Sequence, residues 1–363
     1  MESKFFLNPS MFEEKEKLIL DNGSMKAYAF VYSTGVLAIR VENEKGYFII
    51  LPYQGQQIWR AKFLGKSLAM KTMFTEPVPT RDFLESYGPF YMHCGVRAMG
   101  VCGPEDTHAP HGELPVAEYK NAWLLSGEDE KGAYIAVSGE YIGKKSFNYN
   151  YRFIPECRLY AGETVMHISV HLENLRTKPL TYMYLGHANF RPVDGSELCY
   201  SAKYDSDHIK VHKIIDPSTP KEIAEPLAKY MDELEKNPAL HHKIGAPNQY
   251  YNPEICFTIY YEKDEEGMAH TMQRMPDGNA FYITHPVDAL PIGIRWMAKT
   301  GDEDSLGMVL PATAEHLGYT HAKNNGQLKT LAPGAELNFT IKLGLLEAKE
   351  AENVAKKIEK IVK

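Results

Sequence analysis

Short segments rich in β-branched and aromatic residues recur along almost the whole chain, and this recurrence limits the fold more than any other feature. The stretch from Leu18 to Phe63 contains MKAYAFVY, VLAIRVE and GYFIILPY, separated by turn-forming residues such as Asn22 and Gly23. The later segments are AYIAVSGEY, FNYNYRFIPECRLY, TVMHISVHLEN, LTYMYLGHANF, EICFTIYY, NAFYITH, IGIRWMA and LNFTIKLGLL. Such segments are typical of strands. Because no long helices alternate with them, the sequence predicts an antiparallel, all-β fold.

The number of candidate strands and the absence of a blade-like internal repeat favour one large two-sheet sandwich over a propeller or a solenoid. The chain has no Pro-rich or Ser-rich linker, and its composition does not shift between its halves. We therefore expect residues 1–363 to form a single domain.

Two helices are expected beside the strands. The first begins near Thr219, which offers an N-cap before Pro220, and runs to about Glu235. The second covers about 347–362, where apolar residues recur at helical spacing on one face. We expect this face to dock on the sheet rather than to serve a partner.

Charge and cysteine content exclude several classes of function. The 47 acidic and 40 basic residues give a formal net charge of −7, and no Lys/Arg run is longer than a pair. The chain therefore lacks the electrostatic footprint that nucleic acid or an anionic membrane requires. The five cysteines form no CxxC pair, which argues against a disulfide framework or a zinc knuckle. Residues 1–17 lack the pattern of a signal peptide, so we expect a cytoplasmic protein, and nothing in the sequence argues against a homodimer.

The densest polar cluster lies between Tyr91 and Tyr119, among glycines and prolines that present side chains to solvent. Its polar members are His93, Arg97, Asp106, His108, His111 and Glu113. His108, His111 and Glu113 are residue types that bind zinc, manganese or iron, but their spacing matches no closed metal motif. We therefore expect no metal. A structural loop and an acid/base or binding role toward a sugar are the alternatives, and the second is favoured.

A second cluster, YMYLGHANFRPVDG, ends a predicted strand with His187 and Asn189 and begins a turn with Arg191. Polar groups at the end of a strand are typical of a site. A lone histidine is more often structural, but the company of His187 favours function. Five other histidines have no such company and are expected at the surface: His208, His212, His241, His242 and His270.

Over most of its length the sequence resembles the aldose 1-epimerase (galactose mutarotase) superfamily, and more closely its bacterial aldose-epimerase-like branch. PYQGQQIWRAKFLGKSL is similar to an early pair of strands in that family, and CGVRAMG to the segment with its substrate arginine, here Arg97. His111-Gly112 matches the first histidine of the family. HISVHLENLRTKPLTYMYLGHANFRPVDG, which ends near the second histidine, His187, is the most specific match.

The resemblance implies a β-supersandwich and a cofactor-independent interconversion of the anomers of a free or modified monosaccharide. Opening a pyranose ring requires one group that takes the proton of the C1 hydroxyl and another that protonates the ring oxygen. By resemblance, His187 is the acid and His111 holds the anomeric oxygen. SLGMVLPATAEHLGY resembles the strand that carries the glutamate of the family, but Pro311 stands at that position, and the nearest acid, Glu315, is our candidate for the base.

Substrate contacts are expected from Arg97, Arg191, Asn189 and Glu113, with an aromatic face from Trp296 or Tyr282. Arg295 and Trp296 are neighbours on a predicted strand, so only one of them can face the ligand. We expect Arg295 to do so.

Two other functions stay open. A carbohydrate-binding or regulatory protein of the same fold is suggested by the displaced glutamate. A metal-dependent sugar isomerase or lyase would use His108, His111 and Glu113.

Overall fold

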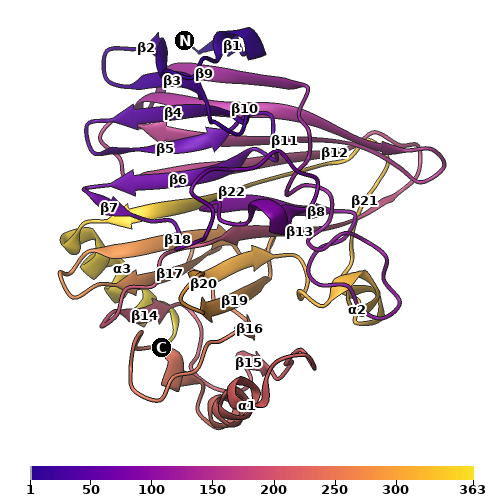
Figure 1. Cartoon of the computed structure of the whole chain (residues 1–363), viewed down its shortest axis with the longest axis vertical. Helices are drawn as coiled ribbons and strands as arrows, with labels where there is room; N and C mark the ends of the chain where they lie inside the picture. Colours follow the sequence, from indigo (N-terminus) through magenta and orange to yellow (C-terminus); the bar gives the residue numbers. More distant parts are fainter. Residues whose placement is uncertain (1) are drawn as a thin grey trace.

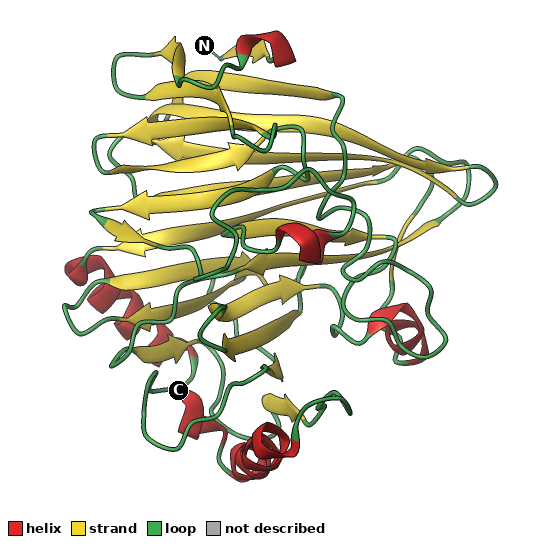
Figure 2. Ribbon diagram, in the orientation of Figure 1, coloured by secondary structure: helices red, strands yellow, loops and turns green. Residues whose placement is uncertain are grey.

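The computed structural model describes residues 2–363, and these form two large antiparallel sheets that lie face to face (Figure 1). The all-β prediction is confirmed, since Figure 2 shows strands throughout and helices only at the periphery. No helix in the described part of the chain is both long enough and apolar enough to cross a membrane.

Nine strands form the first sheet. In spatial order they are β1 (Ser3–Phe6), β9 (Asn121–Asp129), β10 (Gly132–Lys145), β11 (Tyr149–Tyr160), β12 (Val165–Asn174), β22 (Glu336–Leu346), β18 (Ala280–Pro286), β17 (Met268–Arg274) and β14 (Glu197–Tyr200). The C-terminal strand β22 lies in the middle of the order, between β12 and β18.

The second sheet has thirteen strands. Its main path is β15 (Ile209–His212), β16 (Ile255–Ile259), β19 (Ile292–Lys299), β20 (Asp304–Ala312), β13 (Leu180–Ala188), β8 (Tyr91–Val96), β6 (Gln57–Phe63), β5 (Gly46–Leu51), β4 (Leu37–Asn43), β3 (Lys26–Val31) and β2 (Lys17–Asp21). β7 (Lys66–Ser67) pairs with β6, and β21 (Lys329–Leu331) pairs with β13.

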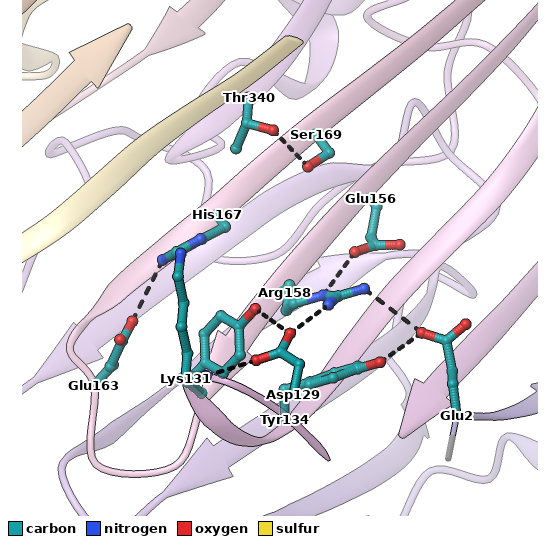
Figure 3. Close-up of polar contacts among 11 residues, drawn as sticks. Glu2, Asp129, Lys131, Tyr134, Glu156, Arg158, Glu163, His167, Ser169 and Thr340 are labelled. Carbon is teal, nitrogen blue, oxygen red and sulfur yellow. Dashed lines mark hydrogen bonds and ion pairs between the residues drawn. The ribbon is translucent and has the colours of Figure 1, made fainter. Parts of the chain in front are cut away.

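The main core fills the space between the sheets, because alternate residues of each strand point inward. On β10, for example, Ile135 and Val137 are buried in this core, whereas Tyr134 and Ala136 belong to a separate apolar cluster. The outward-facing side chains of this sheet pair with one another. Figure 3 shows Arg158 at the centre of such a network, with a guanidinium nitrogen 2.9 Å from Glu156 and another 3.3 Å from Asp129.

The helices lie outside the sandwich. They are α1 (Lys221–Lys236), α2 (Gly318–Asn324) and α3 (Ala348–Ile361), with 3₁₀ turns η1 (Pro9–Met11), η2 (Phe83–Ser86) and η3 (Pro238–His241). α1 and α3 fall where helices are predicted. The cap expected at Thr219 is wrong, because Pro220 takes the N-cap position and no side chain caps α1. Docking of α3 is confirmed: its Ala351, Ala355 and Ile358 pack against β17 and β18.

Candidate active site

A pocket of about 280 Å³ opens on one face of four neighbouring strands, β16, β19, β20 and β13. Alternate residues reach it, as the two-residue period of a strand requires. The residues that line it from the sheet are Glu254, Cys256, Ile294, Trp296, Leu310, Leu185 and His187. Its volume lies near the lower end of the range for ligand pockets, about 300 to 1,000 Å³.

Loops close the pocket from the other side. Their contributions are Phe83 and Leu84 of η2, Tyr87, Val101, Pro110, His111 and His316. Most of the lining is therefore apolar, and the polar groups are three imidazoles, a phenol, an indole N–H, a thiol and a carboxylate. Few polar groups within an apolar wall are typical of a small-molecule site.

His111 and His187, which the sequence places in different clusters, meet in this pocket. Their ring centroids lie 5.1 Å apart in an edge-to-face arrangement. His187 lies near the end of β13, a central strand. His111 stands in the left-handed region with φ of 59°, a conformation that costs free energy in a residue with a side chain.

The turn at His111 is fixed by its neighbours. Its backbone N–H donates to the Gly100 carbonyl at 2.9 Å, and its own carbonyl accepts from Gly95 at 3.0 Å. Gly112 follows with φ of 81°, and a Cβ there would lie 2.2 Å from the Ala98 carbonyl oxygen. Only glycine fits at that position, so the turn orients the His111 imidazole toward the pocket.

Burial keeps the pocket histidines neutral. It lowers the pKa of His111 to about 3, with a further lowering by His187, and the pKa of His187 to about 4. The pKa of His316 falls to about 3 for the same reason, with His212 as the next cause. The Nδ1 atoms of all three are buried and have no hydrogen-bond partner within residues 2–363. A neutral imidazole carries one donor and one acceptor nitrogen, which is the form that exchanges hydrogen bonds with a hydroxyl group in either direction.

Tyr87 lies against His187. Its hydroxyl oxygen is 3.5 Å from His187 Nε2 and 3.5 Å from Asn189 Oδ1. Burial raises the pKa of Tyr87 well above its ordinary value, so the phenol stays protonated and can donate. Asn189 donates through Nδ2 to the Pro89 carbonyl at 3.0 Å and lies behind the pocket lining, where it orients its neighbours.

Trp296, and not Arg295, faces the pocket. The Trp296 ring lies 5.6 Å from the His187 ring, and its Nε1–H donates to Glu254 Oε2 at 2.6 Å. Arg295 points to the interior, where its Nε donates to the Met308 carbonyl at 2.8 Å and its Nη1 to His241 Nε2 at 2.6 Å. The expected orientation of Arg295 is therefore wrong, because β19 presents the next residue, Trp296, to the pocket.

The structure also corrects the expectation for two of the five histidines expected at the surface. His241 is fully buried beside Arg295, and His270 is buried beneath α3, where Nδ1 is 2.7 Å from the Tyr282 hydroxyl and Nε2 is 2.8 Å from Asp264. His208, His212 and His242 are half-buried. Tyr282 thus lies on the nine-stranded sheet and not in the pocket.

Glu315 lies outside the pocket lining, although its neighbour His316 is part of it. Its carboxylate accepts hydrogen bonds from Gln327 at 3.1 Å and Thr258 at 3.2 Å, and Oε2 lies 2.8 Å from His321 Nε2. These hydrogen bonds outweigh the effect of burial and lower the pKa of Glu315. Glu315, the base expected from the sequence, is thus held outside the pocket by these three partners.

Arg97 and Glu113 also lie outside the pocket and bind each other. The Arg97 backbone N–H donates to Glu113 Oε1 at 3.2 Å, and Arg97 Nη1 donates to the Thr181 carbonyl at 2.6 Å. Glu113 accepts from the Tyr151 hydroxyl at 2.5 Å and lines a separate, wider groove of about 1,060 Å³. Arg191 is exposed and also lies outside the lining of the pocket.

The donors proposed for a metal do not converge. His111 lies in the pocket, Glu113 lies in the groove, and His108 Nδ1 is 2.8 Å from the Ala109 carbonyl oxygen. Within residues 2–363, the donors close enough to share an ion are His171, Glu173 and Glu336 on the outward side of β12 and β22. Glu173 is already paired with Arg152 at 2.6 Å.

Sequence reasoning did not find Tyr87, Glu254 or His316. Glu254 is the first residue of EICFTIYY and stands two residues before Cys256, so the strand period places both on one face, which is the one signal that could have shown it. Tyr87 and His316 come from loops, and no sequence pattern places loop residues against a sheet.

Comparisons with known proteins agree with the fold. A family model described as "Domain of unknown function (DUF4432)" matches residues 33–345. No curated protein matches the chain.

Three solved structures illustrate the likeness of fold. A Klebsiella pneumoniae protein provisionally named an aldose 1-epimerase is 15% identical with a TM-score of 0.81, over 100% of this chain and 96% of that one. A galactose mutarotase-like protein from Clostridium acetobutylicum is 12% identical with a TM-score of 0.59, over 89% and 99%. One from Lactobacillus casei is 14% identical with a TM-score of 0.52, over 85% and 99%. The fold is that of galactose mutarotase-like proteins, as the resemblance predicts.

Proposed function

The chain belongs to the family described as "Domain of unknown function (DUF4432)", and from this premise we propose that it is an isomerase that interconverts the anomers of a monosaccharide without a cofactor. One observation carries the proposal. His111 and His187, distant in the chain, lie with their ring centroids 5.1 Å apart in a pocket of about 280 Å³ on a galactose mutarotase-like sheet.

Opening of the sugar ring requires two proton transfers, in which the C1 hydroxyl loses a proton and the ring oxygen gains one. A base takes the proton of the C1 hydroxyl, the freed electron pair forms the C1 carbonyl, and the bond between C1 and the ring oxygen breaks. The ring oxygen takes a proton from His187. Rotation about the C1–C2 bond and reclosure by the reverse steps give the other anomer.

The neutral state of the two histidines determines how the rate of this reaction should depend on pH. With a pKa of about 4, His187 is protonated in roughly one molecule in a thousand at pH 7. An imidazole must carry its second proton to act as a general acid, so we expect faster turnover below neutrality. His111, with a pKa of about 3, stays neutral and can hold the anomeric oxygen by a hydrogen bond.

The walls of the pocket suit a sugar ring. Trp296 offers an aromatic surface for the C–H side of a pyranose, and the Tyr87 hydroxyl can donate to a sugar oxygen. Phe83 and Leu84 of η2 line the opposite side with apolar surface.

A sugar-binding protein without catalysis is the second candidate. It is favoured by the position of Glu315, which lies outside the pocket, and by Pro311 at the site of the glutamate of the superfamily. Saturable binding of a sugar without anomer exchange would support this function.

Anomer exchange measured by polarimetry or by NMR on a panel of freshly dissolved monosaccharides tests the proposal. We expect the purified protein to accelerate equilibration of at least one sugar, and His187→Ala to lower kcat by about 10² to 10⁴. Acceleration that His187→Ala leaves intact would contradict the assignment of the acid.

A further inference from the structure

We propose that Glu254 is the base that takes the proton of the C1 hydroxyl, an inference that rests on the proposed function. Among the residues 2–363 that line the pocket, Glu254 carries the only carboxylate. The strand expected to supply the base, β20, contributes Leu310 to the same pocket. The proposed base therefore comes from the residue just before β16, the outermost of the four strands, and not from β20.

The contacts of Glu254 leave it able to accept a proton. Its Oε2 accepts the Trp296 Nε1–H at 2.6 Å, which anchors one oxygen of the carboxylate. Its Oε1 makes no hydrogen bond to any side chain or backbone group of residues 2–363. One oxygen is held in place, and the other is free for the substrate.

Trp296 links this carboxylate to the acid of the reaction. The indole ring lies 5.6 Å from the His187 ring and 5.9 Å from the Tyr87 ring, centroid to centroid, and its N–H reaches Glu254. The same side chain thus packs against His187 and orients the carboxylate. The C1 hydroxyl and the ring oxygen are bonded to the same carbon, so the two proton transfers need an acid and a base close together, and Trp296 contacts both His187 and Glu254.

Glu315 offers the opposite situation. Its Oε1 accepts from Thr258, and its Oε2 is shared by His321 and Gln327. A carboxylate that holds three partners would have to break these hydrogen bonds to reach a substrate. It also lies outside the pocket lining.

The step balances without a co-reactant. Glu254 Oε1 takes the C1 hydroxyl proton as the bond between C1 and the ring oxygen breaks, and protonated His187 gives its proton to that oxygen. When the other face closes, Glu254 returns its proton to the C1 oxygen and His187 regains one from the hydroxyl that attacks. The enzyme ends in its starting state.

The test compares the wild type and four variants, at Glu254, Glu315 and Glu235, by NMR exchange of the sugar that the wild type turns over fastest. We expect Glu254→Gln, which keeps the shape and the acceptor for Trp296, to lower kcat by about 10² to 10⁴ with little change in KM. Added formate should partly restore Glu254→Ala, because it supplies the missing carboxylate. Glu235→Gln, an exposed glutamate of α1, is the matched control and should match the wild type.

Each outcome decides one point. Retained kcat in Glu254→Gln, or loss of kcat in Glu315→Gln alone, overturns the inference while the proposed function stands. A wild type that exchanges no sugar overturns the proposed function itself. Calorimetric binding of the sugar by Glu254→Gln shows that a loss of kcat comes from chemistry and not from a collapsed pocket.

Discussion

Arg295 Nη1 lies 2.6 Å from His241 Nε2, and within residues 2–363 the acceptors of this fully buried guanidinium are that imidazole and the Met308 carbonyl, with no carboxylate among them. His241 must accept at Nε2, so the proton of its ring is on Nδ1, which faces the Pro238 carbonyl. Burial and the charge of Arg295 both lower the pKa of His241 well below its usual range. The neutral imidazole thus accepts a hydrogen bond from the buried guanidinium and lowers the free-energy cost of burying its charge.

We predict that His241→Leu lowers the free energy of unfolding by about 2 to 3 kcal/mol, because it leaves a buried N–H of a charged group without an acceptor. Urea unfolding followed by tryptophan fluorescence measures the change. The double variant His241→Leu, Arg295→Met should lose less than the single one, since both polar partners are then removed. An equal or greater loss in the double variant would contradict this account.

A second prediction concerns His285, which is 1% exposed and has no hydrogen-bond partner on either ring nitrogen within the described chain. Replacement by Leu removes two unsatisfied polar atoms and should raise the free energy of unfolding by about 1 kcal/mol at pH 7.

The gain from His285→Leu should grow as the pH falls. Burial lowers the pKa of His285 to about 3, whereas it is about 6.5 in an unfolded chain. Between these values the unfolded state binds the proton and the folded state does not, so the wild type loses up to about 1.4 kcal/mol per pH unit at this residue as the pH drops. Thermal unfolding at pH 7 and pH 5 tests this, and a difference between the two proteins that does not change with pH would refute it.

The third prediction is the pH dependence of catalysis. Because the pKa of His187 is about 4, the protonated fraction rises about tenfold for each unit between pH 7 and pH 5. We expect kcat/KM to rise with it over this range. A profile that is flat from pH 7 to pH 5 would show that His187 does not act as the acid.

The fourth prediction is a preference for uncharged sugars. Neither lysine nor arginine lines the pocket among residues 2–363, and the one charged group there, Glu254, is negative. Sugar phosphates and uronates should bind about tenfold more weakly than the parent sugar, because the Glu254 carboxylate repels their negative charge. Competition assays measure the ratio, which Glu254→Gln should reduce. Equal affinity for a sugar and its phosphate would argue against this pocket as the site.

The sequence predicts the all-β fold, and it singles out two clusters whose histidines meet in the candidate pocket, for an identifiable reason. Strand segments repeat many times, and the clusters around His111 and His187 each stand out as polar groups among turns and strand ends. The strand period also shows that Arg295 and Trp296 face opposite sides. It does not show which side holds the pocket, because that depends on how β19 packs against the other sheet.

The carboxylate is harder to predict than the histidines. Glu315 is the nearest acid to the expected position, yet three hydrogen bonds hold it outside the pocket. Glu254 reaches the pocket only because β16 pairs with β19 and places Cys256 opposite Trp296. A pairing between strands so far apart in the chain leaves no local pattern in the sequence.

β22 joins two parts of the nine-stranded sheet that are otherwise separate. It pairs with β12 on one side, as Val165 opposite Gly344 shows, and with β18 on the other. Until this late segment has been synthesised and inserted, both neighbours keep an open edge of unsatisfied amides and carbonyls. Such edges promote self-association, so a nascent chain halted before residue 336 should be prone to aggregate.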